Sequence, residues 1–222
     1  KRDLELFNLL VEHGASTNTS TESWTRALES SAKKGLESGV RYCIAGGADI
    51  NGVFDVPLIE ASCGGHTSIV RQLLDAGADI NRLKHRSTAL TAASTNGHED
   101  IVILLIERGA EIKLNVLPSE SSPLVCASRG GHKAIVRLLL DNGANTNTFD
   151  VGESALSAAS ESGQENVARF LIERGAMVEG TMSRSSPLIH ASRGGHKAIV
   201  RLLLENGADI NIVHGGRTAL CE

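Results

Sequence analysis

The sequence predicts an all-α solenoid in which short helix-turn-helix units stack side by side, joined by projecting β-hairpin loops. Its main evidence is a Gly-Ala pair that recurs every 30 to 34 residues, each time after an amphipathic apolar run. Aromatic residues make up only 3% of the chain, so Leu, Ile, Val and Ala must fill its interior. Such side chains suit thin layers of closely packed helices. The pairs stand at residues 14–15, 47–48, 77–78, 109–110, 143–144, 175–176 and 207–208.

The first helix of each unit is predicted from its start. Ser122-Pro123 and Ser186-Pro187 place a hydroxyl at an N-cap and a proline at the first helical position, where its missing N–H costs nothing. Thr88-Ala89, Ser154-Ala155 and Thr218-Ala219 occupy the same place in other units. A glycine then separates the two helices of a unit, at positions 65, 97, 131, 163 and 195.

The second helix is the amphipathic run, such as 135–140, and we expect the glycine of each Gly-Ala pair to end it in the C′ position. Segments such as Ala48-Asp-Ile-Asn51 and Ala78-Asp-Ile-Asn81 then lead into the hairpin. Their recurring aspartates, Asp49, Asp79 and Asp209, are interpreted as part of the repeat framework. A single unit cannot bury its apolar face alone, so stability must come from stacking on neighbours.

A period near 33 residues with these landmarks resembles the ankyrin repeat, and the resemblance covers essentially the whole chain. It implies one array over 1–222: a partial repeat (1–18), six full repeats (19–51, 52–81, 82–113, 114–147, 148–179, 180–211) and the start of another (212–222). The His of the family's Thr-Pro-Leu-His start is replaced throughout, by Glu29 and Thr91 for example. The hydrogen bonds that this His makes between repeats are therefore in doubt.

The second unit is the most eroded, and its link from Asn51 to Val56 is about three residues short, which predicts a clipped hairpin. A longer period is also present. Residues 121–144 and 185–208 differ at only three positions across a 64-residue offset. Proline-starting units at residues 57, 123 and 187 alternate with alanine-starting units at 27, 89, 155 and 219, so we infer duplication of a two-repeat cassette. Both ends fall within a repeat, and we expect a monomer unless such uncapped ends stack.

Composition and motifs argue against several classes of function. The net charge of −4 and the pI of about 6.1 give no general attraction for nucleic acid or acidic membranes, and no apolar run is long enough to span a bilayer. Phosphate-loop, dinucleotide, serine-hydrolase and zinc-protease signatures are absent from the sequence. We therefore expect no enzyme activity and no cofactor.

Two clusters of reactive residues could suggest chemistry. Histidines recur at one place near the start of the second helix, but stacked helices lie about 8–10 Å apart, too far for ligands of one zinc ion. We interpret them as a repeated helix-start residue and predict no metal site. The four cysteines lack CxxC spacing and are interpreted as reduced thiols, which favours a cytoplasmic location, with the nucleus as an alternative. The histidines are His66, His98, His132 and His196.

By resemblance, ankyrin arrays bind through hairpin tips and the exposed ends of first helices, which line a concave groove. Candidate residues at the helix ends are Lys33, Lys34, Thr95, Asn96, Arg129, Glu161 and Arg193. Candidate residues at the tips are Trp24, Lys84, His85, Asp150, Met182, Arg184 and His214. Trp24, the one tryptophan, has two interpretations: an exposed hot spot, or a cover for the apolar end of the stack.

Arg129 and Arg193 should share a face two layers apart, about 20 Å by helix-packing distances, with Glu161 between them. This row predicts recognition of an acidic segment, because arginine favours paired contacts to carboxylates. The alternative is that both arginines were simply copied with the cassette.

The sequence thus predicts a protein-binding scaffold module. The alternative function is an intramolecular spacer or docking element of a larger protein. The near-identical cassettes also resemble arrays in fungal multidomain proteins with NACHT-type domains.

Overall fold

A computed structural model describes residues 20–112, 122–147, 149–150, 153–179, 186–213 and 218–220 of the chain. Over these residues helices alternate as first and second members of six successive pairs. The first helices are α2 (Thr21–Lys34), α4 (Pro57–Cys63), α6 (Ala89–Asn96), α8 (Pro123–Gly130), α10 (Ala155–Glu161) and α12 (Pro187–Arg193). The second helices are α3 (Glu37–Ala45), α5 (Thr67–Asp75), α7 (Glu99–Glu107), α9 (Lys133–Asp141), α11 (Glu165–Glu173) and α13 (Lys197–Glu205).

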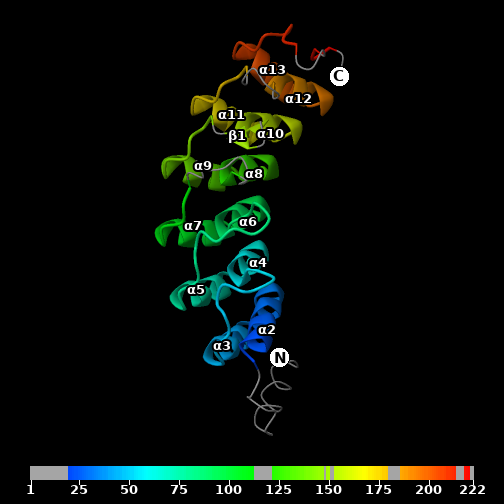
Figure 1. Cartoon of the computed structure of the whole chain (residues 1–222). Coiled ribbons are helices and arrows are strands. Elements are labelled where there is room, and N and C mark those ends of the chain that lie inside the picture. The colour runs from blue at the N-terminus through cyan, green and yellow to red at the C-terminus, as the bar shows by residue number, and fades with distance from the viewer. Residues whose placement is uncertain are drawn as a thin grey trace.

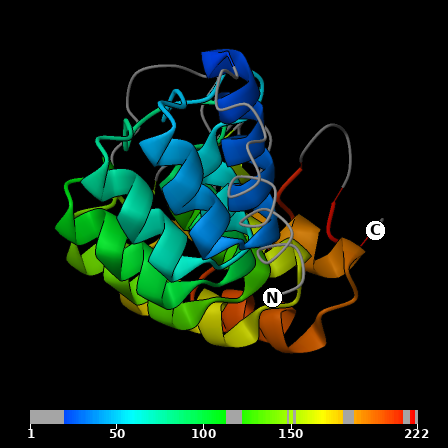
Figure 2. The same cartoon turned by 90° about the horizontal axis from the view of Figure 1, so that it is seen from below.

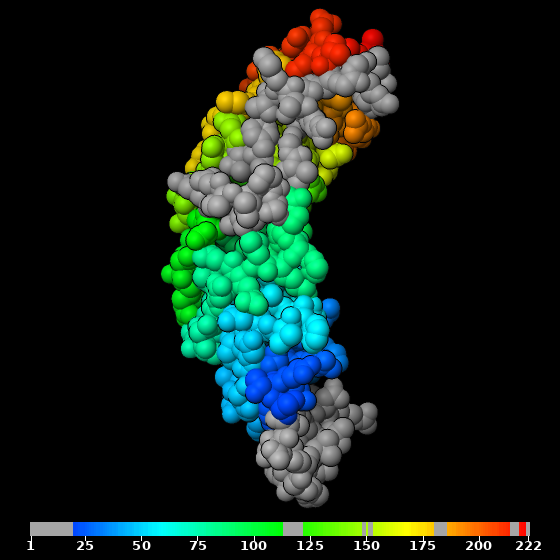
Figure 3. Space-filling view, viewed as in Figure 1, coloured from blue at the N-terminus to red at the C-terminus, as the bar shows by residue number. Residues whose placement is uncertain are grey.

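The pairs form a two-layered column (Figure 1). First helices pack on the first helices of neighbouring pairs, and second helices pack on second helices. Figure 2 shows the column from below, along its length, with successive pairs turned relative to one another so that their helices fan out. The space-filling view shows that the column bends, with its convex side toward the second helices (Figure 3). The predicted all-α solenoid is confirmed.

The core is thin and repeats with the units. One leucine of every first helix is at most 2% exposed, and one β-branched residue of each second helix from α5 onward is at most 1% exposed. A regular ladder of mid-sized side chains therefore replaces a single thick core, as the shortage of aromatics predicts. The leucines are Leu28, Leu58, Leu90, Leu124, Leu156 and Leu188, and the β-branched residues are Ile69, Ile101, Ile135, Val167 and Ile199.

The ends of the second helices confirm the predicted role of the Gly-Ala pairs. Gly77 has a φ of 90°, and its N–H donates to the carbonyl of Leu74 while the next residue, Ala78, donates to Leu73. These two backbone hydrogen bonds close the last helical turn. They need a residue in the left-handed region, where glycine carries no steric penalty. The same geometry recurs at Gly109, Gly143, Gly175 and Gly207.

The starts of the first helices confirm the predicted N-cap positions but not all of the predicted caps. Thr88 and Ser154 each accept a hydrogen bond from the backbone N–H three residues on. Ser122 and Ser186 also stand at the N-cap, but their side chains make no capping bond. Proline at the next position already removes one unpaired donor and fixes φ, so these two helices start without the hydroxyl.

Two of the predicted hairpins are found among the described residues. Strands β1 (Phe149–Asp150) and β2 (Glu153–Ser154) pair antiparallel. Lys84 and Ser87 exchange both backbone hydrogen bonds around a two-residue turn, whose His85 and Arg86 have φ values of 47° and 71°. Positive φ at both central residues is the geometry of a tight hairpin turn. The short link from Asn51 to Val56 contains no paired strand, as the clipped hairpin predicts.

Side chains at the loop bases join successive units through their backbones. The Asp79 N–H donates to Asn51 Oδ1 at 2.9 Å, and the Glu111 N–H donates to Asn81 Oδ1 at 2.9 Å. Asp79 in turn accepts from the N–H of Asn81 at 3.1 Å. The interpretation of these aspartates as framework residues is confirmed, because Asp49 and Asp209 repeat the local bond.

One predicted boundary is wrong. The sequence pattern places the first helix of the second unit from residue 27 and Trp24 at a hairpin tip, but α2 already begins at Thr21. Ser20 caps this helix by accepting a hydrogen bond from the Ser23 N–H. Arg26 and Glu22, one turn apart on the helix, form an ion pair. Because residues 20–34 contain no proline or glycine, nothing local stops the helix from extending toward the N-terminus.

Candidate binding surface

The exposed ends of the first helices form a row along one face of the column. At the ends of α2, α4, α6, α8 and α10 a buried small residue is followed by an exposed one: Ser62 by Cys63, Ser94 by Thr95, and Ser128 by Arg129. Ser160 and Glu161 repeat the pattern, as do Ala32 and Lys33. The buried residues are all 0% exposed, while the residues that follow them differ in charge and size. The scaffold thus holds one register and leaves the next side chain free to vary.

Two of the four buried serines bond to their own helices, whereas Ser62 Oγ and Ser94 Oγ are buried without a hydrogen-bond partner. Ser128 Oγ donates to the carbonyl of Leu124, and Ser160 Oγ donates to that of Leu156, both at 2.7 Å. A hydroxyl bonded back to the preceding turn needs no other partner, so it can lie in the tightly packed layer between units. In α8 and α10 these bonds fix the backbone immediately before the exposed residue.

The repeated histidines brace the same row from behind. His98 Nε2 lies 3.0 Å from the carbonyl oxygen of Cys63, His132 Nε2 3.2 Å from that of Thr95, and His196 Nε2 3.0 Å from that of Glu161. Each ring therefore bonds the end of the preceding unit's first helix. All stand at the start of a second helix, so their interpretation as repeated helix-start residues is confirmed.

Their packing also explains one glycine of the turn. Gly97 has a φ of 78°, and a Cβ there would come within 2.6 Å of the His132 ring. Among the described residues, no group of three or more His, Cys, Asp or Glu side chains could hold a metal ion.

At the N-terminal end of the row, the charged side chains pair with one another. Lys84 bonds to Asp55 and lies 3.1 Å from Glu60, which in turn lies 3.5 Å from Lys33. Burial alone would lower the pKa of Lys84, but its hydrogen bonds to Asp55 and Glu60 raise it above the usual value. The Lys84 ammonium is thus held in ion pairs with Asp55 and Glu60.

Further along, Arg129 forms an ion pair with Glu153 of strand β2. Burial raises the pKa of Glu153 more than this arginine lowers it, and Glu153 Oε1 is buried without a hydrogen-bond partner. His190 Nδ1 lies 3.8 Å from Glu161, so this contact is an ion pair only when the ring is protonated. The row therefore carries cationic and anionic groups that are already partly matched.

Comparison with known proteins identifies the architecture. The family profile described as ankyrin repeats (3 copies) matches residues 28–116 and 114–182, and the ankyrin repeat profile matches residues 184–215. The chain belongs to the ankyrin-repeat family. The human ASB11 ankyrin repeat domain, known from a crystal structure, superposes with a TM-score of 0.79 at 28% identity. The match covers 87% of this chain and 90% of that one. A search of curated proteins gives no significant match.

Ankyrin repeats are generally protein-interaction modules, and the family is typically non-enzymatic. In this ankyrin array, the helix-end candidates Lys33, Lys34, Thr95 and Asn96 are exposed, as are Arg129, Glu161 and Arg193. Within the described part of the chain, no helix combines the length and apolarity needed to cross a membrane.

The tip candidates fare less well. Lys84 is half-buried in its ion pairs, whereas His85 is exposed at the turn. Asp150 is wrongly placed at an exposed tip: it is 9% exposed and accepts from Arg86 Nη2 at 3.2 Å and from the Ser122 N–H at 3.3 Å. A carboxylate can be buried when donors on two sides satisfy it, and here they come from two other units. Met182, Arg184 and His214 lie outside the described residues.

Trp24 lies near the start of α2 rather than at a tip, because the helix extends to Thr21. It is half-buried and packs against the core, and a Cβ at Gly46 would come within 2.6 Å of its indole ring. The structure therefore favours the interpretation that Trp24 covers the apolar end of the stack.

The sequence pattern misses Glu29, which stands in the place of the family's usual histidine. Its carboxylate is 6% exposed, and Oε1 accepts from the backbone N–H groups of Val53, Phe54 and Asp55 at 2.8, 3.0 and 3.2 Å. This bonding holds Val53 and Phe54 at the tip of the clipped link, 60% and 62% exposed. Two features of the sequence could have identified its role: a charged residue at a position that is buried in the repeat, and a link three residues short in the following loop.

The cysteines differ in accessibility. Cys43 is buried, and burial raises the pKa of its thiol to about 11, while burial also raises the pKa of the half-buried Cys126. Cys63 lies exposed on the row of first-helix ends, with the Asn96 amide 3.6 Å from its sulfur. None of the three is paired in a disulfide, which agrees with reduced thiols.

Proposed function

We propose that this ankyrin array is a protein-binding module that holds its partner along the row of exposed first-helix ends and the adjoining loop tips. One observation carries the proposal: from α2 to α10 a buried small residue is followed at once by an exposed side chain whose chemistry differs from unit to unit. A surface built only for stacking needs no such variation, whereas a recognition surface needs a rigid frame with changeable contacts.

We further propose that the partner presents an acidic segment to Arg129 and Arg193. Both side chains are exposed on the row. The guanidinium of Arg129 carries five N–H donors, so its ion pair with Glu153 leaves donors for a second carboxylate. At the other end of the row, Lys33 and Lys34 add two exposed cations. Glu161 lies between the arginines and would favour a partner whose negative charges are spaced rather than continuous.

The test uses synthetic peptides rich in Glu and Asp as probes, with Lys-rich peptides of the same length as the counter-set. Binding is measured for the natural chain and for the double variant Arg129→Ser/Arg193→Ser. Arg41→Ser/Arg169→Ser is the matched control, because it removes the same charge from two exposed positions on the second helices, α3 and α11. We expect acidic peptides to bind the natural chain. Only Arg129→Ser/Arg193→Ser should weaken this binding, by about tenfold for each lost contact of about 1.4 kcal/mol.

Equal loss in both variants would indicate nonspecific attraction and contradict the proposal. No binding of any acidic peptide by the natural chain would remove the acidic-segment hypothesis and favour the spacer function instead. Because Arg129→Ser also removes the ion pair with Glu153, circular dichroism must show that both variants are fully folded at the temperature of the binding assay, so that a loss of binding reports the surface and not the fold.

A further inference from the structure

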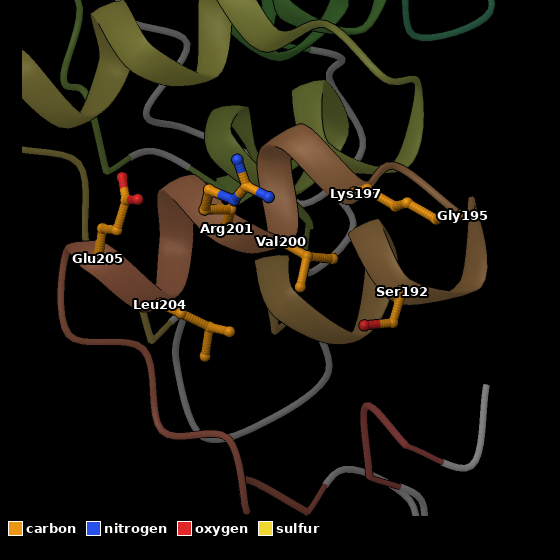
Figure 4. A pocket seen from close by; sticks show the side chains of 7 residues that line it. All are labelled: Ser192, Gly195, Lys197, Val200, Arg201, Leu204 and Glu205. Atoms are coloured by element: carbon orange, nitrogen blue, oxygen red, sulfur yellow. The ribbon is translucent and has the colours of Figure 1, made fainter.

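A hollow of about 520 Å³ opens on α13, the second helix of the last described pair. Five residues of α13 line it together with two from α12 and the following turn, and Figure 4 shows their side chains around the opening. The five are Lys197, Val200, Arg201, Leu204 and Glu205. Most of its lining belongs to α13 on the second-helix side of the column, and Ser192, next to Arg193 at the end of α12, borders it.

The same five positions occur 64 residues earlier on α9, within the duplicated cassette. There they are Lys133, Val136, Arg137, Leu140 and Asp141, so four are identical and the fifth is a shorter carboxylate. On α9 this face is covered by α11, which packs directly against it.

The covering helix brings two side chains to this face. Phe170 is 7% exposed, with Lys133 Nζ and Arg137 Cζ each 5.4 Å from its ring centroid. Cations at this distance are attracted to the negative face of an aromatic ring. Arg174 lies four residues after Phe170, 5.2 Å from the same ring, and forms an ion pair with Asp141. The α9 face therefore accepts an aromatic ring and an arginine.

The interface between α5 and α7 contains the arginine–carboxylate pair but not the aromatic contact with the cations. Arg108 pairs with Asp75 of α5 at 2.8 Å, which repeats the ion pair. However, α5 carries Thr67 where α9 carries Lys133, and the residue in the place of Phe170 is Leu104. An arginine is therefore found opposite α5 and α9, which both end in an aspartate. The aromatic ring is found only opposite α9, which carries both Lys133 and Arg137. Both the cations and the carboxylate are present on α13.

The α13 face is uncovered among the described residues. Val136 is 0% exposed and Leu140 9%, whereas their counterparts Val200 and Leu204 are half-buried and 37% exposed. Beyond α13, Thr218-Ala219 repeats the first-helix start of Thr88-Ala89, and Ala219 packs against the core.

We propose that this face of α13 is a docking site for an amphipathic helix that carries an aromatic residue and, four residues later, an arginine. The occupant is the second helix of an ankyrin unit whose first helix begins at Ala219. The aromatic ring lies between Lys197 and Arg201, and the arginine pairs with Glu205. The face thereby selects which kind of unit can follow, because a unit without these two residues would leave three charges unmatched.

The test extends the chain after Leu220 with one further unit taken from the chain itself. One extension copies residues 157–179, which places the counterparts of Phe170 and Arg174 opposite α13. The matched extension copies residues 189–211, which has Leu202 and Asn206 at those two places. The midpoint of urea unfolding is measured for each, alone and with Glu205→Arg.

We expect the first extension to raise the midpoint more than the second. Glu205→Arg should remove about half of that difference, and exchanging the added arginine for glutamate should restore it, since only a direct pair gives such coupling. Equal gains from the two extensions, or a Glu205→Arg effect of the same size in both, would overturn the proposal.

A second readout needs no extension. Phe170→Leu with Arg174→Asn converts the occupied α9 site into the mismatched kind, and its loss of stability gives the expected size of the effect. The occupant could instead be a second copy of the chain. Sedimentation that shows a dimer of the 222-residue chain, dissociated by Glu205→Arg, would overturn the proposed occupant. A negative peptide-binding result for the first-helix ends leaves this test unaffected.

Discussion

Two links between units solve one structural problem with buried carboxylates used in different ways. In the clipped link after α3, Glu29 reaches in from α2 and accepts three backbone N–H groups of residues 53–55. In the link after α9, residues 149–150 and 153–154 pair with each other, and Asp150 points outward to Arg86 and the Ser122 N–H. Glu29 thus accepts the hydrogen bonds of one loop, whereas Asp150 connects its own unit to the units of Arg86 and Ser122.

The difference shows how loop length sets the task of a carboxylate. A link of full length pairs its own backbone groups across a hairpin, so its side chains are available for neighbouring units. A link three residues shorter cannot form that pairing, and its backbone donors need another acceptor. A glutamate in the register of the family's histidine supplies it, because one carboxylate oxygen can accept several bonds.

The largest expected effect is at Glu29. Glu29→Ala removes the acceptor of three backbone donors and should lower the free energy of unfolding by about 2–4 kcal/mol. Glu29→Gln should cost about half as much, because the amide oxygen still accepts but the bonds lose their charge assistance. Urea unfolding measures both. Glu22→Ala, at an exposed position on the same helix, is the control and should cost less than about 0.5 kcal/mol.

Inserting three residues between Gly52 and Val53 tests the reason for this effect. In the Glu29→Ala chain the insertion should recover part of the lost stability, because the longer link can pair its own backbone. In the natural chain it should recover nothing. A Glu29→Ala chain that the insertion only destabilises would break the connection between loop length and the carboxylate.

A smaller effect is expected at Asp150. Asp150→Ala should lower the free energy of unfolding by about 1–3 kcal/mol, because it leaves the Ser122 N–H and the Arg86 guanidinium without their acceptor. A double-mutant cycle with Arg86→Ala should show coupling of the two substitutions. Additive effects of the two would mean that Asp150 does not act between units.

The two kinds of first helix sharpen the comparison further. Ser154 accepts from the Ser157 N–H at 3.1 Å, whereas Ser122 makes no capping bond and precedes a proline. Ser154→Ala should therefore cost about 1 kcal/mol, and Ser122→Ala only a few tenths. Thermal unfolding of the two variants measures the difference. Equal costs would show that proline does not replace the capping hydroxyl.

The sequence predicts the periodic parts of this molecule well because they follow from local chemistry. Gly77 ends its helix and Thr88 begins the next one for reasons carried within a few residues. Asp150 and Trp24 are misplaced because their surroundings are set by residues far away: Arg86 is 64 residues from Asp150, and α2 extends to Thr21. Glu29 is missed because its partners are backbone donors, which a sequence pattern does not display. The helix-end candidates are predicted from register and lie exposed as that register requires.

The smallest expected effect is an opposite response of the two links to pH. The hydrogen bond from Lys84 lowers the pKa of Asp55 below its ordinary value of 3.8, whereas burial raises the pKa of Glu153 above its ordinary value of 4.5. A depressed folded-state pKa means that Asp55 contributes stability above its unfolded value and loses that contribution as pH falls. A raised pKa means that Glu153 costs stability once it ionises, so its contribution worsens as pH rises through the unfolded value.

Asp55→Asn should therefore flatten the loss of stability on acidification, and Glu153→Gln should steepen it. Unfolding measured at several pH values between about 3 and 6, where carboxylates titrate, tests both slopes. Parallel changes of slope in the two variants would contradict the assignment of opposite environments. They would also imply that the Arg129 ion pair outweighs burial at Glu153, and the two carboxylates would then respond to pH in the same way.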